Sequence, residues 1–176
     1  MCIRDRKKQV DILDVGVGSG CIALTIGKKY KFARLCGIDY NMDTLNVARI
    51  NSKKLGVPMT FYNLDVLDKS LWGALGRFDI IVSNPPYIDE KDRQVMADNV
   101  LLYEPERALF AGDDKFVFYK KIEELSVQHI NPGGLVYLEI HEDYAAEVID
   151  IFRKDKREIE LKKDLQGKDR MIKIQF

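Results

Sequence analysis

Short apolar runs alternate with amphipathic segments along most of this chain of 176 residues. Each run is rich in Val, Ile and Leu and is bounded by Gly, Pro, Asn or Asp, which is typical of a buried strand. The segments between the runs carry apolar residues at helical spacing. We expect strands at residues 10–15, 33–38, 59–64, 78–83 and 135–140, and helices at residues 21–30, 43–55, 116–130 and 144–154. Such alternation predicts a parallel sheet with helices on both faces.

Further segments complete the expected architecture. Residues 158–163 and 171–176 read as two final strands that form an antiparallel pair around Gln166-Gly167. Residues 70–76 read as a short connector, and the polar segment 89–115 is long for a loop, which favours a functional lid with a helical turn or two. The expected fold is therefore α/β, with a mostly parallel seven-stranded sheet and a C-terminal antiparallel hairpin.

Composition limits the classes of function. An apolar share of 46% and a charged share of 32% are those of a soluble globular protein, here of one domain. The chain has no apolar run near the ~20 residues of a membrane helix and no signal peptide, so we expect a cytoplasmic protein without membrane contact. The 28 basic residues are balanced by 28 acidic ones, which counts against a nucleic-acid substrate without excluding it.

Cysteine and histidine residues point to no further chemistry. The three cysteines have neither a metal-type spacing nor a disulfide framework, so no metal site is expected. Cys21 and Cys36 lie in apolar contexts and are expected to be small buried residues. His129 and His141 are interpreted as structural.

Glycine or polar residues follow four of the predicted strands where each ends. They are the turn 16–20, Asp39, Asp65 and Asn84. In a parallel sheet with flanking helices, ligands bind beyond the carboxyl ends of the strands. Because four such features at successive strand ends are rarely a coincidence, we expect one ligand site there.

The glycine turn and Asp39 indicate the kind of ligand. Gly16, Gly18 and Gly20 let the backbone approach a ligand closely, but the third glycine of a dinucleotide fingerprint is missing, because Cys21 occupies its position. The turn therefore favours a cofactor without a pyrophosphate. Asp39 could accept both hydroxyls of a ribose, although a solvated or helix-capping aspartate is the alternative.

A second carboxylate lies one strand further out. Asp65 could accept hydrogen bonds from an adenine amine while Val66 packs on the ring, or it could cap the short connector.

The run Asn84-Pro85-Pro86-Tyr87 forms the remaining strand end. Proline cannot continue the sheet and restricts the residue before it, so this loop is stiff and its carbonyl groups stay open. An amide side chain beside free carbonyls suits the binding of a planar –NH₂ group, with both hydrogens accepted. A proline-rich turn that merely ends a strand is the alternative.

Together these residues resemble the S-adenosylmethionine-dependent methyltransferases, and within them the HemK/PrmC family, which methylates glutamine in peptide chain release factors. The resemblance runs from about Val10 to the C-terminus. Its motifs are residues 12–21, 37–39, 78–88, 103–105, 108–109, 132–134, 138–140 and 163–170. The segments 103–105 and 163–170 are the more specific to the glutamine family.

The resemblance implies a Rossmann-like class I methyltransferase fold and S-adenosylmethionine as cofactor. We expect the chain to be a monomer. It assigns cofactor contacts to Gly16, Val17, Gly18, Ser19, Gly20, Asp39, Asp65, Val66 and Asn84. It assigns the substrate loop to Asn84, Pro85, Pro86 and Tyr87, with Asn84, Pro85 and Tyr87 as the catalytic residues. Asn84 and Pro85 would accept the two N–H bonds of the substrate amide, and Tyr87 would pack over its plane.

The chain departs from the family at several positions. Val17 replaces a hydroxyl residue, and Lys115 and His141 replace glycines. Family members carry a helical domain before the catalytic one, whereas residues 1–9 here match nothing, so we expect a catalytic domain at 10–176 without that helical domain.

Three functions remain open at this point. The first is methylation of the glutamine of a release factor. The second is methylation of an exocyclic amine, such as that of adenine, in a nucleic acid by the same loop, and the third is a cofactor-binding domain made inactive by truncation.

Overall fold

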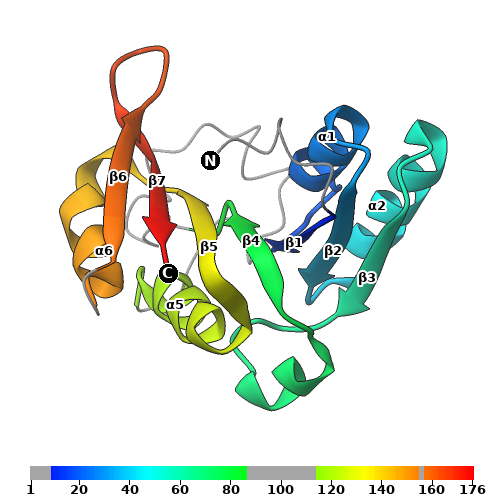
Figure 1. Cartoon of the computed structure of the whole chain (residues 1–176), viewed down its shortest axis with the longest axis horizontal. Coiled ribbons are helices and arrows are strands. Elements are labelled where there is room, and N and C mark those ends of the chain that lie inside the picture. Colours follow the sequence, from blue (N-terminus) through cyan, green and yellow to red (C-terminus); the bar gives the residue numbers. More distant parts are fainter. Residues whose placement is uncertain (1–8, 87–113, 155–156) are drawn as a thin grey trace, which may run out of the picture.

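The computed structural model of the chain describes residues 9–86, 114–154 and 157–176 (Figure 1). Its strands form one seven-stranded sheet in the order β3-β2-β1-β4-β5-β7-β6. The strands are β1 (Val10–Val15), β2 (Ala33–Asp39), β3 (Met59–Asn63), β4 (Phe78–Ser83), β5 (Ile130–Glu139), β6 (Glu158–Lys163) and β7 (Asp169–Gln175). Neighbours from β3 to β5 pair in parallel, whereas β7 pairs antiparallel with both β5 and β6. The predicted parallel sheet with a C-terminal antiparallel hairpin is confirmed.

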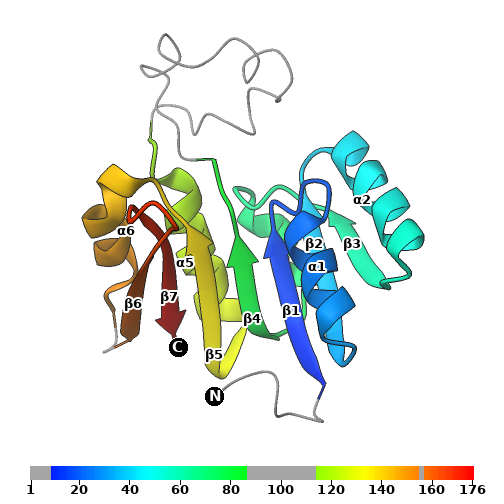
Figure 2. The same ribbon diagram turned by 90° about the horizontal axis from the view of Figure 1, so that it is seen from above.

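Helices lie on both faces of this sheet, as the alternation of elements predicted. They are α1 (Cys21–Lys29), α2 (Met42–Leu55), α5 (Val117–His129) and α6 (Ala145–Phe152), with two short 3₁₀ helices, η2 (Lys69–Ala74) and η4 (Glu142–Tyr144). Figure 2 shows α1 and α2 beside β1 to β3, and α5 and α6 beside β5 to β7. Across the described ranges, no helix is both long and apolar enough to cross a membrane.

Alternation along the central strands gives the protein two apolar clusters. Ile12 of β1 packs with Leu24 of α1 on one face, and the next residue, Leu13, packs with Ile122 of α5 on the other. This alternation follows from the period of two in a strand. Buried on both faces, β1 and β4 read in the sequence as almost continuous apolar runs.

The ends of α2 follow from particular residues. The side chain of Asn41 accepts hydrogen bonds from the backbone N–H groups of Asp43 (2.9 Å) and Thr44 (3.3 Å) and so caps the first turn. At the other end Gly56 adopts a left-handed conformation, with a φ of 63°, and its N–H donates to the carbonyl of Lys53. These two signals hold α2 in place directly after β2.

β5 differs from the prediction. The expected strand 135–140 begins earlier, because Ile130 already pairs with Phe78 and the register shifts before the pair of Ile80 and Leu135. Gly133 has a φ of 75°, and its N–H donates to the carbonyl of Phe176. Residues 131–134 are therefore an irregular part of β5 that bonds to Phe176. They are not a turn outside the sheet.

Candidate functional site

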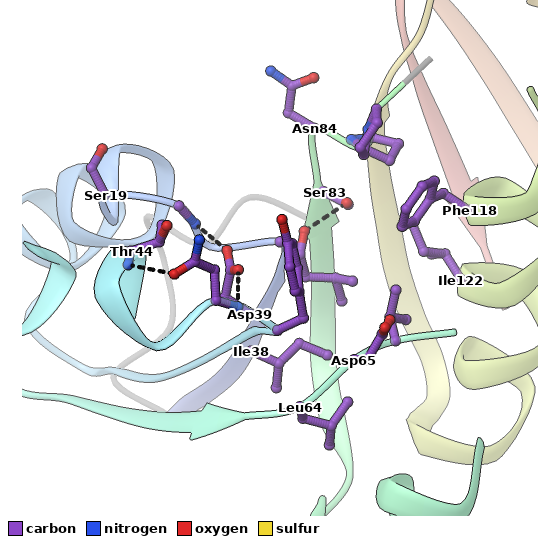
Figure 3. A pocket seen from close by; sticks show the side chains of 18 of the residues that line it. Ser19, Ile38, Asp39, Thr44, Leu64, Asp65, Ser83, Asn84, Phe118 and Ile122 are labelled. Carbon is purple, nitrogen blue, oxygen red and sulfur yellow. Dashed lines mark hydrogen bonds between the residues drawn. The ribbon is translucent and has the colours of Figure 1, made fainter. Parts of the chain in front are cut away.

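A cavity of about 610 Å³ lies at the carboxyl ends of β3, β2, β1 and β4. Figure 3 shows its walls, formed by the loops that follow these strands on one side and by α5 on the other. Of the residues predicted for the site, those that line the cavity are Gly16, Gly18, Ser19, Asp39, Asp65, Val66, Asn84, Pro85 and Pro86. The four strand ends thus contribute to a single cavity.

The other predicted residues lie elsewhere. Val17 is buried and faces Gly37 of β2 rather than the cavity. Gly20 is the N-cap residue directly before α1 and does not line the cavity either. Tyr87 lies outside the described residues, as does most of the expected lid 89–115.

The glycine turn has a backbone that other residues would strain. Gly16, Gly18 and Gly20 all have positive φ, at 69°, 55° and 86°. The N–H groups of Gly16 and Val17 both donate to the carbonyl of Ile38, which ties the turn to β2. A Cβ on Gly20 would approach Leu24 to 2.8 Å.

Asp39 joins two walls of the cavity. The residue is 8% exposed, and its carboxylate accepts one hydrogen bond at each oxygen, from the N–H of Gly18 and from that of Asn41, both at 3.0 Å. A carboxylate has about four lone-pair sites, so acceptor capacity remains for hydroxyl groups in the cavity. The alternative of a helix-capping role is wrong, since Asn41 caps α2.

The alternative for Asp65, that it caps the short connector, is wrong as well. The 3₁₀ helix η2 is capped by Asp68, whose side chain accepts from the N–H of Ser70. Asp65 accepts from the N–H of Leu67 at 2.9 Å in a local turn and lines the cavity beside Val66.

The loop after β4 begins on a fixed strand end. The hydroxyl of Ser83 donates to the carbonyl of Val15 at 2.7 Å, which joins the end of β4 to the end of β1. Beyond it Asn84 is exposed and Pro85 is buried. Figure 3 shows the Asn84 side chain at the edge of the cavity, far from Leu64 at its floor.

Several lining residues were not identified from the sequence. Tyr40 is one of them, and it could have been predicted, because it is an aromatic residue directly after Asp39 at the end of a strand. Phe118 and Ile122, one helical turn apart on α5, form the far wall, and Figure 3 shows both on the side opposite Asp39. In the sequence these two apolar residues are indistinguishable from ordinary core positions.

Asp14 is a buried acid behind the glycine turn. It is 1% exposed, and its carboxyl accepts a hydrogen bond from the N–H of Ala23 at 3.2 Å. Burial raises the pKa of Asp14 to about 7; the bond from Ala23 opposes this rise, and the nearby Asp39 adds to it. Protonation of Asp14 thus falls within the pH range in which most proteins are studied.

The two cysteines within the described ranges differ from each other. Cys36 is buried, as predicted, and burial raises the pKa of its thiol to about 12. Cys21 is exposed, so the prediction for it was wrong. It is the first residue of α1, where its side chain points away from the core and lies 3.2 Å from the hydroxyl of Ser19.

Comparison with known proteins places this cavity in context. The family described as the methyltransferase small domain matches residues 2–130. The chain is similar to the release factor glutamine methyltransferase of Flavobacterium psychrophilum, at 39% identity over 171 residues, which is 96% of this chain and 59% of the relative. It is also similar to that of Bacteroides thetaiotaomicron, at 40% identity over 164 residues, or 92% of this chain and 58% of the relative. The chain therefore spans less than two thirds of the length of these relatives.

Solved structures show the same fold at lower identity. A methyltransferase from Pyrococcus furiosus has a TM-score of 0.70 at 22% identity, covering 96% of this chain and 75% of that one. TrmN from Thermus thermophilus has a TM-score of 0.69 at 19% identity, covering 96% and 44%. The family model covers nearly three quarters of the chain, and the solved structures share its fold. The chain therefore belongs to the methyltransferase small-domain family.

Proposed function

We propose that this chain transfers a methyl group from S-adenosylmethionine to the side-chain amide nitrogen of a glutamine in a peptide chain release factor. The observation that carries the proposal is the convergence of a glycine turn, a buried carboxylate and a proline-stiffened amide loop on one cavity. Similarity to the release factor glutamine methyltransferases supports the choice of substrate.

The residues around the cavity fit this cofactor. Because β3, β2, β1 and β4 are neighbours, Asp65, Asp39, Gly18 and Asn84 follow one another across the cavity in that order. An adenine at Asp65, a ribose at Asp39 and an amino-acid group at the glycine turn would leave the methyl end near Asn84. The volume of about 610 Å³ is also within the range of small-molecule sites.

S-adenosylmethionine supplies a methyl group bonded to a positively charged sulfur. The task of the protein is to present the amide nitrogen to that methyl group. The Asn84 side-chain oxygen and the Pro85 carbonyl oxygen would accept the two N–H bonds of the glutamine amide, which favours a pyramidal nitrogen with its lone pair aimed at the carbon. Such orientation can supply up to ~7–11 kcal/mol of the barrier.

The methyl transfer needs no general base, because the proton leaves only after the new bond has formed. The nitrogen lone pair forms the new N–C bond, the electrons of the broken C–S bond return to sulfur, and S-adenosylhomocysteine is released. The methylated nitrogen is then strongly acidic and loses one of its protons to water.

Transfer of a radiolabelled methyl group to four acceptors tests the proposal. They are an intact release factor, the same factor with its substrate glutamine changed to alanine, duplex DNA and RNA. We expect label on the intact factor and none on the alanine form. Label on DNA or RNA would favour the nucleic-acid amine instead, and cofactor binding without transfer to any acceptor would favour a binding domain.

A further inference from the structure

We propose that Asn51 and Asn63 are positioning residues, each of which holds one half of the cavity in its ligand-binding shape. Neither side chain lines the cavity, but each donates hydrogen bonds to the backbone of a loop that does. The inference rests on the proposed function, because it concerns affinity for S-adenosylmethionine and its fragments.

Asn63, the last residue of β3, holds the half of the cavity around Asp39. Its side-chain N–H₂ group donates to two successive carbonyls, that of Asp39 at 3.1 Å and that of Tyr40 at 2.7 Å. The N–H of Leu64 donates to the same Asp39 carbonyl at 2.9 Å. With both carbonyls turned toward β3, the Asp39 side chain is directed to the N–H groups of Gly18 and Asn41.

Asn51, in α2, holds the half formed by the glycine turn. Its side-chain N–H₂ group donates to the carbonyl of Ser19 at 3.0 Å. Ser19 lines the cavity and precedes Gly20, whose N–H closes the turn by donating to the carbonyl of Val17 at 2.9 Å. A side chain from α2 therefore fixes the turn at the point where α1 begins.

The two halves face different parts of the proposed cofactor. The Asp39 half would meet the adenosine part, and the glycine turn would meet the amino-acid part. If a loop spends part of its time in other conformations, the apparent dissociation constant rises by the inverse of the competent fraction. Loss of each asparagine should therefore weaken different ligands.

The experiment compares three alanine variants by calorimetry. They are Asn51→Ala, Asn63→Ala and the control Asn46→Ala. Asn46 is an exposed residue of α2 whose side chain accepts a hydrogen bond from Arg49 at 2.9 Å, and within the described part of the chain it is not among the residues that line the cavity. The two ligands are S-adenosylhomocysteine and 5′-methylthioadenosine. Both contain the adenosine part, but 5′-methylthioadenosine has no amino-acid group.

Asn63→Ala should weaken the binding of both ligands about five- to tenfold, as expected for solvent-accessible hydrogen bonds. Asn51→Ala should weaken S-adenosylhomocysteine by a similar factor and leave 5′-methylthioadenosine within about twofold. The control should change neither. Unchanged affinities in both variants would overturn the inference. An equal loss of affinity for both ligands in Asn51→Ala would overturn it too, because general destabilisation of the protein has that effect.

Hydrogen exchange on the ligand-free chain gives a second readout. Asn63→Ala should speed exchange at the amides of Gly18 and Asn41, which donate to Asp39, and Asn51→Ala should do so at Gly20. Unchanged exchange in both variants would overturn the positioning role. Failure of the parent chain to bind either ligand would instead remove the proposed cofactor, while the exchange result would still decide the role of the asparagines.

Discussion

Replacing Asp14 by asparagine should make the stability of the protein less dependent on pH. The folded-state pKa of Asp14 is raised from 3.8 to about 7 by burial. Between these values the folded state binds one more proton than the unfolded state does. The contribution of Asp14 to the free energy of unfolding is therefore fully present below about pH 4 and is lost as the pH rises through about 7.

The expected size follows from the two pKa values. Each unit of difference corresponds to about 1.4 kcal/mol, so the whole shift is worth about 4 kcal/mol. Between pH 5 and pH 8, linkage assigns to Asp14 a loss of about 2.5 kcal/mol. For a domain of this size that loss lowers the midpoint of thermal unfolding by about 5–10 °C.

Urea unfolding of wild type and Asp14→Asn at pH 5, 6, 7 and 8 measures this difference. Asparagine can still accept the hydrogen bond from Ala23 and stays neutral, so the wild type should lose stability relative to the variant as the pH rises. A suitable control is Asp68→Asn, because hydrogen bonds from Ser70 lower the pKa of exposed Asp68, and its contribution changes only at more acidic pH. Parallel profiles for wild type and Asp14→Asn would show that Asp14 is ionised when folded and that the reasoning is wrong.

Three further predictions concern the cavity. Asp39→Ala should weaken the binding of S-adenosylmethionine tens- to hundreds-fold in calorimetry, because charge-assisted hydrogen bonds are worth about 1.5–3 kcal/mol each; unchanged affinity would remove Asp39 from the site. Asn84→Ala should lower turnover of a glutamine peptide by ~10²–10³ while cofactor affinity stays within about tenfold, and retention of more than a tenth of the turnover would contradict the amide mechanism. Gly20→Ala should lower the free energy of unfolding by about 1–3 kcal/mol in a denaturation assay, because Gly20 has a left-handed backbone and a Cβ there would collide with Leu24. The control Gly76→Ala, where a Cβ meets open space, should change the free energy of unfolding far less.

Much of the fold could be predicted from local patterns. The period of apolar residues and the Gly and Pro breaks place β1, β4 and α2 within a residue or so of their observed bounds. The start of β5 could not be placed, because Asn131 and Pro132 are typical of a turn. Bonds from distant parts of the chain keep this segment in the sheet: residues 133 and 134 bond to Phe176, and the side chain of Asn131 donates to Asp79 of β4.

The cavity was predictable where its residues sit at strand ends and not where they come from helices. Asp39 and Asp65 stand out because each is a charged residue at the end of an apolar run in the sequence, where it contributes nothing to the core. Phe118 reaches the cavity only because α5 crosses back over the sheet, a contact that spacing in the sequence does not reveal. Cys21 was misassigned because the first two residues of α1, Cys21 and Ile22, are exposed beside the glycine turn, whereas Ala23 is the first residue of the helix to be buried.

The order of the strands separates the part of the chain that lines the cavity from the edge of the sheet formed by β6 and β7. Among the described residues, every one that lines the cavity lies between positions 15 and 86, except Phe118 and Ile122, and none comes from β5, β6 or β7. The turn between β6 and β7 carries Leu165, which is fully exposed. A reporter domain or an affinity peptide could therefore be inserted at this turn, and the engineered protein should retain its cavity.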